Sequence, residues 1–213
     1  MKKTLLFSVL LLSGCAFLSN LMVNKQCYID EEKCEQHLLD FNKDRAEFKT
    51  DGAYYALYDM NGQAYLEELD AGIKDNTYHQ KNIINLIKTE TALTPNEMLQ
   101  RYVTLIENKN NEIKPKDYAK MLSKLRENVE KGTARKANSK DCNVYGLTAT
   151  DYINTNDVVT TFLGHFVKDD KAYAIVVTFD NPQALKSTYN FKSSGWNATK
   201  LAGKIINNIC ESK

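Results

Sequence analysis

Few side chains in this sequence of 213 residues are spaced for nucleophilic chemistry. Thr133 is the only serine or threonine with a lysine three positions later, Lys136, and that amine would have to take the hydroxyl proton before any attack. Cys142 together with His165 or His37 would form a thiolate–imidazole pair. We predict neither arrangement to be catalytic, and for Cys142 we prefer a disulfide, the commoner state of a cysteine in an oxidising compartment.

The other titratable side chains do not form a metal-binding pattern. The three histidines are scattered along the chain, and the cysteines do not have the spacing of a zinc site. Acidic clusters at residues 30–32 and 67–68 are typical of solvent-exposed faces. We therefore predict neither a metal nor a cofactor.

The N-terminus indicates a different chemistry, lipid attachment. Two lysines precede a short apolar run over residues 5–12, which is typical of a secretory signal and falls short of the roughly 20 apolar residues that span a bilayer. The run ends in Leu12-Ser13-Gly14-Cys15, which resembles the bacterial lipobox, whose cysteine is acylated and becomes the mature N-terminus. We predict a signal peptide over residues 1–14 and a lipid anchor on Cys15. The protein would then lie outside the cytoplasm, facing the periplasm from the outer membrane in a Gram-negative cell.

Four further cysteines are candidates for disulfide bonds, because an extracytoplasmic compartment permits them: Cys27, Cys34, Cys142 and Cys210. Cys27 and Cys34 would lie too far apart for a bridge along one straight helix, since seven residues make about two turns. They would pair only if the chain bends between them. The sequence leaves all three connectivities open.

The charge balance excludes nucleic acid as a partner. Lys and Arg number 28 against 27 Asp and Glu, and no basic stripe is interleaved with aromatic residues. The length after Cys15 suits one domain with a substantial core. We assign residues 15–50 to a tether with a polar helix over 28–49, and residues 51–213 to the domain.

The patterning of the domain predicts an α+β fold. Residues 53–60 and 63–69 flank Asn61-Gly62, a strong hairpin signal, while residues 158–167 and 172–179 form the clearest strand pair. Helices are expected from Pro95, behind the cap Thr94, from Pro115, and over residues 196–210. We predict an antiparallel sheet whose central strand pair is flanked by the opening hairpin, with the last helix packed across it.

Five segments, in sequence order, resemble the transpeptidase domain of the septal class of penicillin-binding proteins. They are residues 52–69, 91–109, 125–137, 159–184 and 187–209, roughly half of the chain. They resemble that domain's opening hairpin, its Val-Thr-Pro-Leu-Gln-Leu helix, the segment before its third active-site motif, its closing strand pair and its final helix. The resemblance implies a truncated transpeptidase-like fold.

The chemistry of that family depends on three motifs, Ser-x-x-Lys, Ser-x-Asn and Lys-(Thr/Ser)-Gly, none of which occurs in this sequence. The family carries its nucleophile and second motif between the opening hairpin and the segment matched at Thr91. This chain has only residues 70–90 there. We interpret the nucleophile region as deleted.

A remnant of the third motif remains in Val144-Tyr145-Gly146-Leu147-Thr148-Ala149-Thr150, which resembles Val-Gly-Gly-Lys-Thr-Gly-Thr. Leu147 stands in the lysine position and cannot bind a carboxylate, and Ala149 replaces a glycine. Lys131-Gly132-Thr133-Ala134 is a weaker match, because the better register places it upstream and outside the active site. We predict a vestigial edge strand over Gly146, Leu147, Thr148, Ala149 and Thr150, to which a peptide strand would add without being cleaved.

These observations predict a membrane-anchored, transpeptidase-like lipoprotein with no catalytic residues. The resemblance places it in cell-wall synthesis or division, with proteins of those processes or peptidoglycan stem peptides as partners. Two alternatives stay open. One is a divergent active transpeptidase or other acyl-transfer enzyme, and the other is a lipoprotein with a role unrelated to the wall.

Overall fold

The computed structural model describes residues 23–27, 52–60, 64–70, 73, 75–108, 112–153, 157–182 and 197–211. Cys15, Cys34, His37 and the helix expected over residues 28–49 lie outside these residues, as does the Asn61-Gly62 turn.

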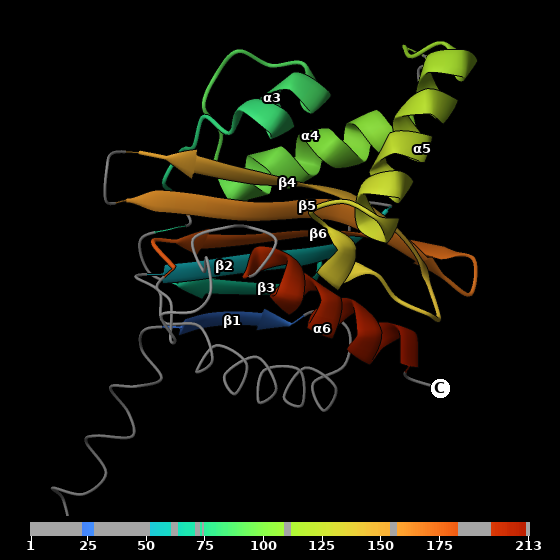
Figure 1. Cartoon of the computed structure of the whole chain (residues 1–213). Helices are drawn as coiled ribbons and strands as arrows, with labels where there is room; N and C mark the ends of the chain where they lie inside the picture. Colours follow the sequence, from blue (N-terminus) through green and yellow to red (C-terminus); the bar gives the residue numbers. More distant parts are fainter. Residues whose placement is uncertain are drawn as a thin grey trace, which may run out of the picture.

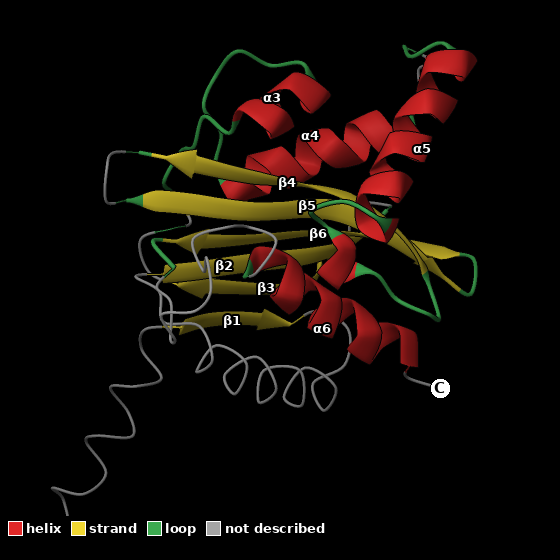
Figure 2. Ribbon diagram, in the orientation of Figure 1, coloured by secondary structure: helices red, strands yellow, loops and turns green. Residues whose placement is uncertain are grey.

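Six antiparallel strands form one sheet in the order β1-β3-β2-β6-β5-β4 (Figures 1 and 2). Their bounds are β1 Val23–Cys27, β2 Gly52–Asp59, β3 Ala64–Asp70, β4 Asn143–Tyr152, β5 Val158–Lys168 and β6 Lys171–Asp180. The strand pair expected from the sequence, β5 and β6, lies inside the sheet, and the opening hairpin flanks it through β2. This part of the predicted arrangement is confirmed.

The β5–β6 hairpin turns within two residues. Lys168 pairs with Lys171, so only Asp169 and Asp170 stand between the strands. Both have positive φ angles, 47° and 64°. A two-residue turn of this hand matches the twist of the strands, and aspartate tolerates the conformation better than most residues.

The helices fall into two groups (Figure 1). The first comprises α3 Lys81–Ile87, α4 Pro95–Glu107 and α5 Pro115–Glu130; the second comprises the short 3-10 helix η1 Arg135–Ala137 and α6 Ala198–Glu211. Alternate residues of the strands pack toward each group, as expected for a sheet buried on both faces. Within the described residues, no helix is long and apolar enough to cross a bilayer.

The α6 face is the more uniformly apolar. Leu201 and Ile206 of α6 are almost completely buried, and they belong to one cluster with Tyr55, Phe166 and Val177 of the strands. Gly203 lets α6 approach η1, because a Cβ there would clash with the Lys136 carbonyl. The helix expected across the sheet is therefore confirmed.

On the opposite face, α4 packs against the centre of the sheet. A capping box fixes its start: Thr94 Oγ1 accepts from the Glu97 amide, and Glu97 accepts from the Thr94 amide. Met98 and Leu99 are fully buried in a cluster with Leu163 and Val176. This face carries the candidate site.

Two elements were missed by the sequence analysis. Val23–Cys27, assigned to the tether, is strand β1 and pairs with β3. Its sequence, VNKQC, lacks the apolar alternation that marks a half-buried strand. Helix α3 buries Ile83, Ile84 and Ile87, but its seven residues are too few for a helical period to be recognised.

Candidate active-site strand and its edge

Strand β4 carries the residues matched to the third motif, Gly146 to Thr150, and is the last strand in the order of the sheet. It pairs with β5, from Asn143 opposite Val167 to Tyr152 opposite Val158. Gly146 lies opposite Gly164, and a Cβ on Gly146 would come within 2.6 Å of the Phe162 ring. Glycine at this position is therefore required by packing.

The face of β4 toward α3, α4 and α5 is apolar. Leu147 and Tyr145 pack against the cluster that contains Tyr102 and Leu163, and Ala149 belongs to that cluster. Leu147 contributes packing and has no group that could bind a carboxylate.

Three side chains cover the outer edge of β4, and we call them the edge ladder. Each donates a hydrogen bond to one main-chain carbonyl: Arg126 Nη1 to Val144 (2.9 Å), Asn128 Nδ2 to Gly146 (3.0 Å) and Asn82 Nδ2 to Thr148 (3.3 Å). The three carbonyls belong to alternate residues, so all point away from β5. These contacts were missed by the sequence analysis and had no local signal, because polar residues on helices usually face solvent.

The hydroxyl of Thr133 is held by Asn128 and Thr148. Its Oγ1 donates to Asn128 Oδ1 (3.2 Å) and lies 2.6 Å from Thr148 Oγ1. The amide oxygen of asparagine does not take protons as a base does, so this contact does not activate the hydroxyl. Lys136 lies in η1 against α6. Burial lowers the pKa of its amine, and the positive charges of Lys200 and Arg135 lower it further. The structure thus shows Thr133 in a hydrogen-bonded turn beside β4.

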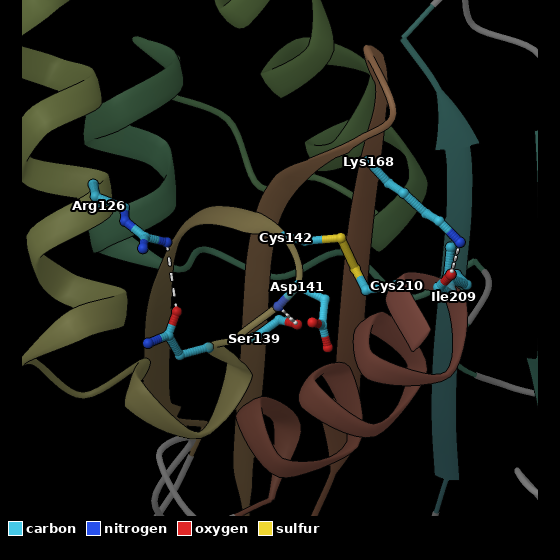
Figure 3. Close-up of a disulfide and its surroundings, with 8 residues drawn as sticks. Arg126, Ser139, Asp141, Cys142, Lys168, Ile209 and Cys210 are labelled. Carbon is cyan, nitrogen blue, oxygen red and sulfur yellow. Dashed lines mark hydrogen bonds between the residues drawn. A yellow bond between two sulfur atoms is a disulfide. The ribbon is translucent and has the colours of Figure 1, made fainter. Parts of the chain in front are cut away.

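Cys142 and Cys210 form a disulfide that joins the start of β4 to the end of α6 (Figure 3). Cys142 is therefore in a disulfide, the state we preferred for it, and it cannot serve as a nucleophilic thiolate beside His165 or His37. Lys168 Nζ also donates to the Ile209 carbonyl, 2.7 Å away, at the same end of α6 (Figure 3). The side chains of Cys27 and Cys34 lie outside the described structure.

His165 is a core residue of the sheet. Its Nδ1 lies 2.8 Å from the Tyr102 hydroxyl, and its ring stacks on Tyr145 at 4.7 Å between centroids. The guanidinium of Arg126 lies over the Tyr145 ring, with its Cζ 5.9 Å from the ring centre. Burial lowers the pKa of His165 to about 4, so the imidazole is neutral at physiological pH.

The described residues contain no cluster of three or more His, Cys, Asp or Glu side chains that would hold a metal ion. One hollow of about 360 Å³ lies beside the ladder, lined by Lys124, Glu127, Asn128, Lys131 and Gly132. A larger one, about 450 Å³, lies between the end of α3 and the outer face of α4, where Lys88, Arg101 and Leu105 line it.

The model of the penicillin-binding protein transpeptidase domain matches residues 57–207, which is most of the chain. The chain belongs to the penicillin-binding protein transpeptidase family. The resemblance noted from five sequence segments is thereby confirmed, and the fold described above is that of a transpeptidase-like domain.

Solved structures agree with this assignment. The transpeptidase domain of the FtsI4 D,D-transpeptidase from Legionella pneumophila has a TM-score of 0.65 at 13% identity, covering 77% of this chain and 91% of that one. The transpeptidase domain of penicillin-binding protein 3 from Burkholderia pseudomallei has a TM-score of 0.61 at 10% identity, covering 84% and 93%. At such identities these likenesses show the fold alone. No curated protein sequence matches the chain significantly.

The segment that we matched to the third motif, residues 144–150, lies within β4. That Leu147 stands in the position of the carboxylate-binding lysine, and Ala149 in that of the glycine, stays a prediction from the sequence. The run Lys131-Gly132-Thr133 begins just beyond the end of α5, upstream of β4.

Proposed function

We propose that this transpeptidase-family protein is non-catalytic, is held at the membrane by lipid on Cys15, and acts in cell-wall synthesis or division through contacts with other proteins. The observation that carries the proposal is the state of β4. Leu147, which we place in the lysine position, packs against an apolar cluster, and the outer carbonyls of Val144, Gly146 and Thr148 are bonded to the edge ladder.

Loss of the acyl-transfer chemistry follows from what that chemistry requires. A serine hydroxyl is a poor nucleophile until a neighbouring base takes its proton. The sequence lacks Ser-x-x-Lys, Ser-x-Asn and Lys-(Thr/Ser)-Gly, so the nucleophile, its base, the proton shuttle and the carboxylate site are all missing. Such groups act as a unit, and a site without all of them has no covalent step.

Fluorescent penicillin tests this proposal in cells, because only a protein with a competent nucleophile is acylated. Membranes that contain the protein should show labelled penicillin-binding proteins and no labelled band at its mass. A labelled band that disappears when the gene is deleted would refute the non-catalytic function.

The anchoring part of the proposal rests on the residues up to Cys15 and on the disulfide. A disulfide between Cys142 and Cys210 suits an oxidising, extracytoplasmic compartment. We expect Cys15→Ser to abolish incorporation of labelled fatty acid and to leave the precursor unprocessed. Equal labelling of the wild type and the variant would contradict the lipid anchor.

Crosslinking in cells tests the role. We expect the wild-type protein to crosslink to proteins of cell-wall synthesis or division and to be recovered with them. Reproducible recovery of unrelated proteins alone would favour a lipoprotein whose role does not concern the wall.

A further inference from the structure

We propose that the edge ladder closes β4 against a peptide strand, so that a peptidoglycan stem peptide does not add to this sheet. The inference concerns non-covalent pairing along β4, and it holds whether or not the protein can be acylated. It replaces the expectation from the sequence that a peptide would add along Gly146 to Thr150.

The direction of the main-chain groups defines what an incoming strand would meet. In an antiparallel pair, successive residues direct their amide and carbonyl groups alternately toward the partner and away from it. The ladder shows that Val144, Gly146 and Thr148 direct theirs away from β5. An added strand would need these carbonyls as acceptors for its own amides.

The ladder occupies all three of these carbonyls. Asn82 belongs to α3, while Arg126 and Asn128 belong to α5, so the edge is covered from both of its ends. Asn128 holds the middle carbonyl, that of Gly146, at 3.0 Å. Natural sheets protect exposed edges in this way, because an unpaired strand recruits other chains.

Two of the three side chains are themselves held in place. Asn128 Oδ1 accepts from the Thr133 amide and hydroxyl, both at 3.2 Å, which leaves its Nδ2 directed at β4. Arg126 Nε donates to Glu130 Oε1 at 2.9 Å while Nη1 reaches Val144. A peptide would therefore have to break these contacts without regaining them, and each broken bond reduces its affinity.

Asn82→Ala combined with Asn128→Asp opens the edge with little other change. Aspartate keeps the oxygen that accepts from Thr133 but cannot donate to the Gly146 carbonyl. The single variant Asn128→Asp is a milder alternative should the double variant fold poorly. The matched control is Asn85→Ala with Ser123→Ala, two exposed residues of the same helices.

The test is a titration of the full chain with a peptidoglycan stem pentapeptide, followed by the backbone amide NMR signals of Gly146 and Thr148. We expect no change in the wild type or the control. In the double variant both signals should shift saturably, because two hydrogen bonds no longer lost lower its Kd about 30-fold below that of the wild type, whose binding lies beyond the titration range. Concentration-dependent dimerisation of the double variant through β4 would also support a closed edge.

Saturable shifts of Gly146 and Thr148 in the wild type would overturn the proposal. So would a folded double variant, or a folded Asn128→Asp variant, that neither binds the peptide nor dimerises. Neither result bears on catalysis, because peptide pairing without a penicillin adduct contradicts the ladder alone. A penicillin adduct on a protein whose Gly146 and Thr148 signals do not change with the peptide contradicts the non-catalytic function alone.

Discussion

The α6 face of the sheet and the outer edge of β4 are built on opposite principles. The α6 face consists of interlocking apolar side chains such as Leu201, Ile206 and Phe166, closed by one disulfide. The edge consists of polar side chains, Asn82, Arg126 and Asn128, that bond the main chain of a strand. One region is a core, and the other is a surface contact.

The difference explains how a transpeptidase fold can persist without transpeptidase motifs. A core requires apolar residues of suitable volume at the right period, and many sequences satisfy that requirement. A catalytic site requires particular groups at particular atoms, so the replacement of a single side chain is enough to remove its function. Substitutions in the two regions should therefore have effects of very different size and kind.

The largest effect is expected on the α6 face. Leu201 is 1% exposed, so Leu201→Asp would bury an unpaired carboxylate and cost roughly 4 kcal/mol or more. Urea denaturation should show an unfolding midpoint far below that of the wild type. Asn208→Asp, on the exposed side of the same helix, should leave the unfolding midpoint almost unchanged. Equal midpoints for the two variants would contradict the packing of α6.

The disulfide links the core to the start of β4, and its removal should have the next largest effect. It closes a sequence separation of 68 residues, so Cys142→Ala with Cys210→Ala should lower the free energy of unfolding by about 4 kcal/mol. Denaturation with a reducing agent provides the control. The reductant should lower the stability of the wild type and leave the double variant unaffected.

Acid should lower the free energy of unfolding through His165, whose ring bonds to Tyr102 of α4. Its pKa is about 4 when folded against 6.5 ordinarily, so the unfolded chain takes up a proton first as the pH falls. The neutral imidazole contributes about 3 kcal/mol to the free energy of unfolding above pH 6.5, and this contribution is lost as the pH falls from 6.5 to 4. His165→Gln should have a flatter pH profile of unfolding than the wild type. Parallel profiles would show that this imidazole does not stay neutral in the fold.

The smallest effect is expected at the edge. Asn128→Asp removes one partly buried hydrogen bond to Gly146 and should cost only about 1 kcal/mol. Thermal unfolding of Asn128→Asp and Leu201→Asp under the same conditions compares the two losses of stability directly. A loss as large as that of Leu201→Asp would mean that the edge is part of the core.

The sequence predicted the elements whose pattern is local and strong. The β5 and β6 runs, the opening strand of the hairpin and the apolar stripe of α6 each show their period within a few residues. The expected strand over Gly146 to Thr150 lies within β4. Among the three disulfide connectivities the sequence could not choose, because the pairing depends on where α6 ends relative to β4.

The edge ladder could not have been predicted from the sequence. Asn82, Arg126 and Asn128 are polar residues on helix surfaces, and their spacing resembles that of any solvated face. Their role depends on how α3 and α5 dock against β4, which is a tertiary property. The burial of His165 is hidden in the same way, since a histidine within an apolar strand has no local marker of its hydrogen-bond partner.

The most direct test of the central claim is the intact mass of the purified full chain after incubation with penicillin, beside an active penicillin-binding protein. We predict no adduct on the wild type. We also predict none on Leu147→Lys, because restoring one member of a cooperative site does not restore the covalent step. A stoichiometric mass increase on the wild type that maps to any serine, threonine or cysteine would contradict the account.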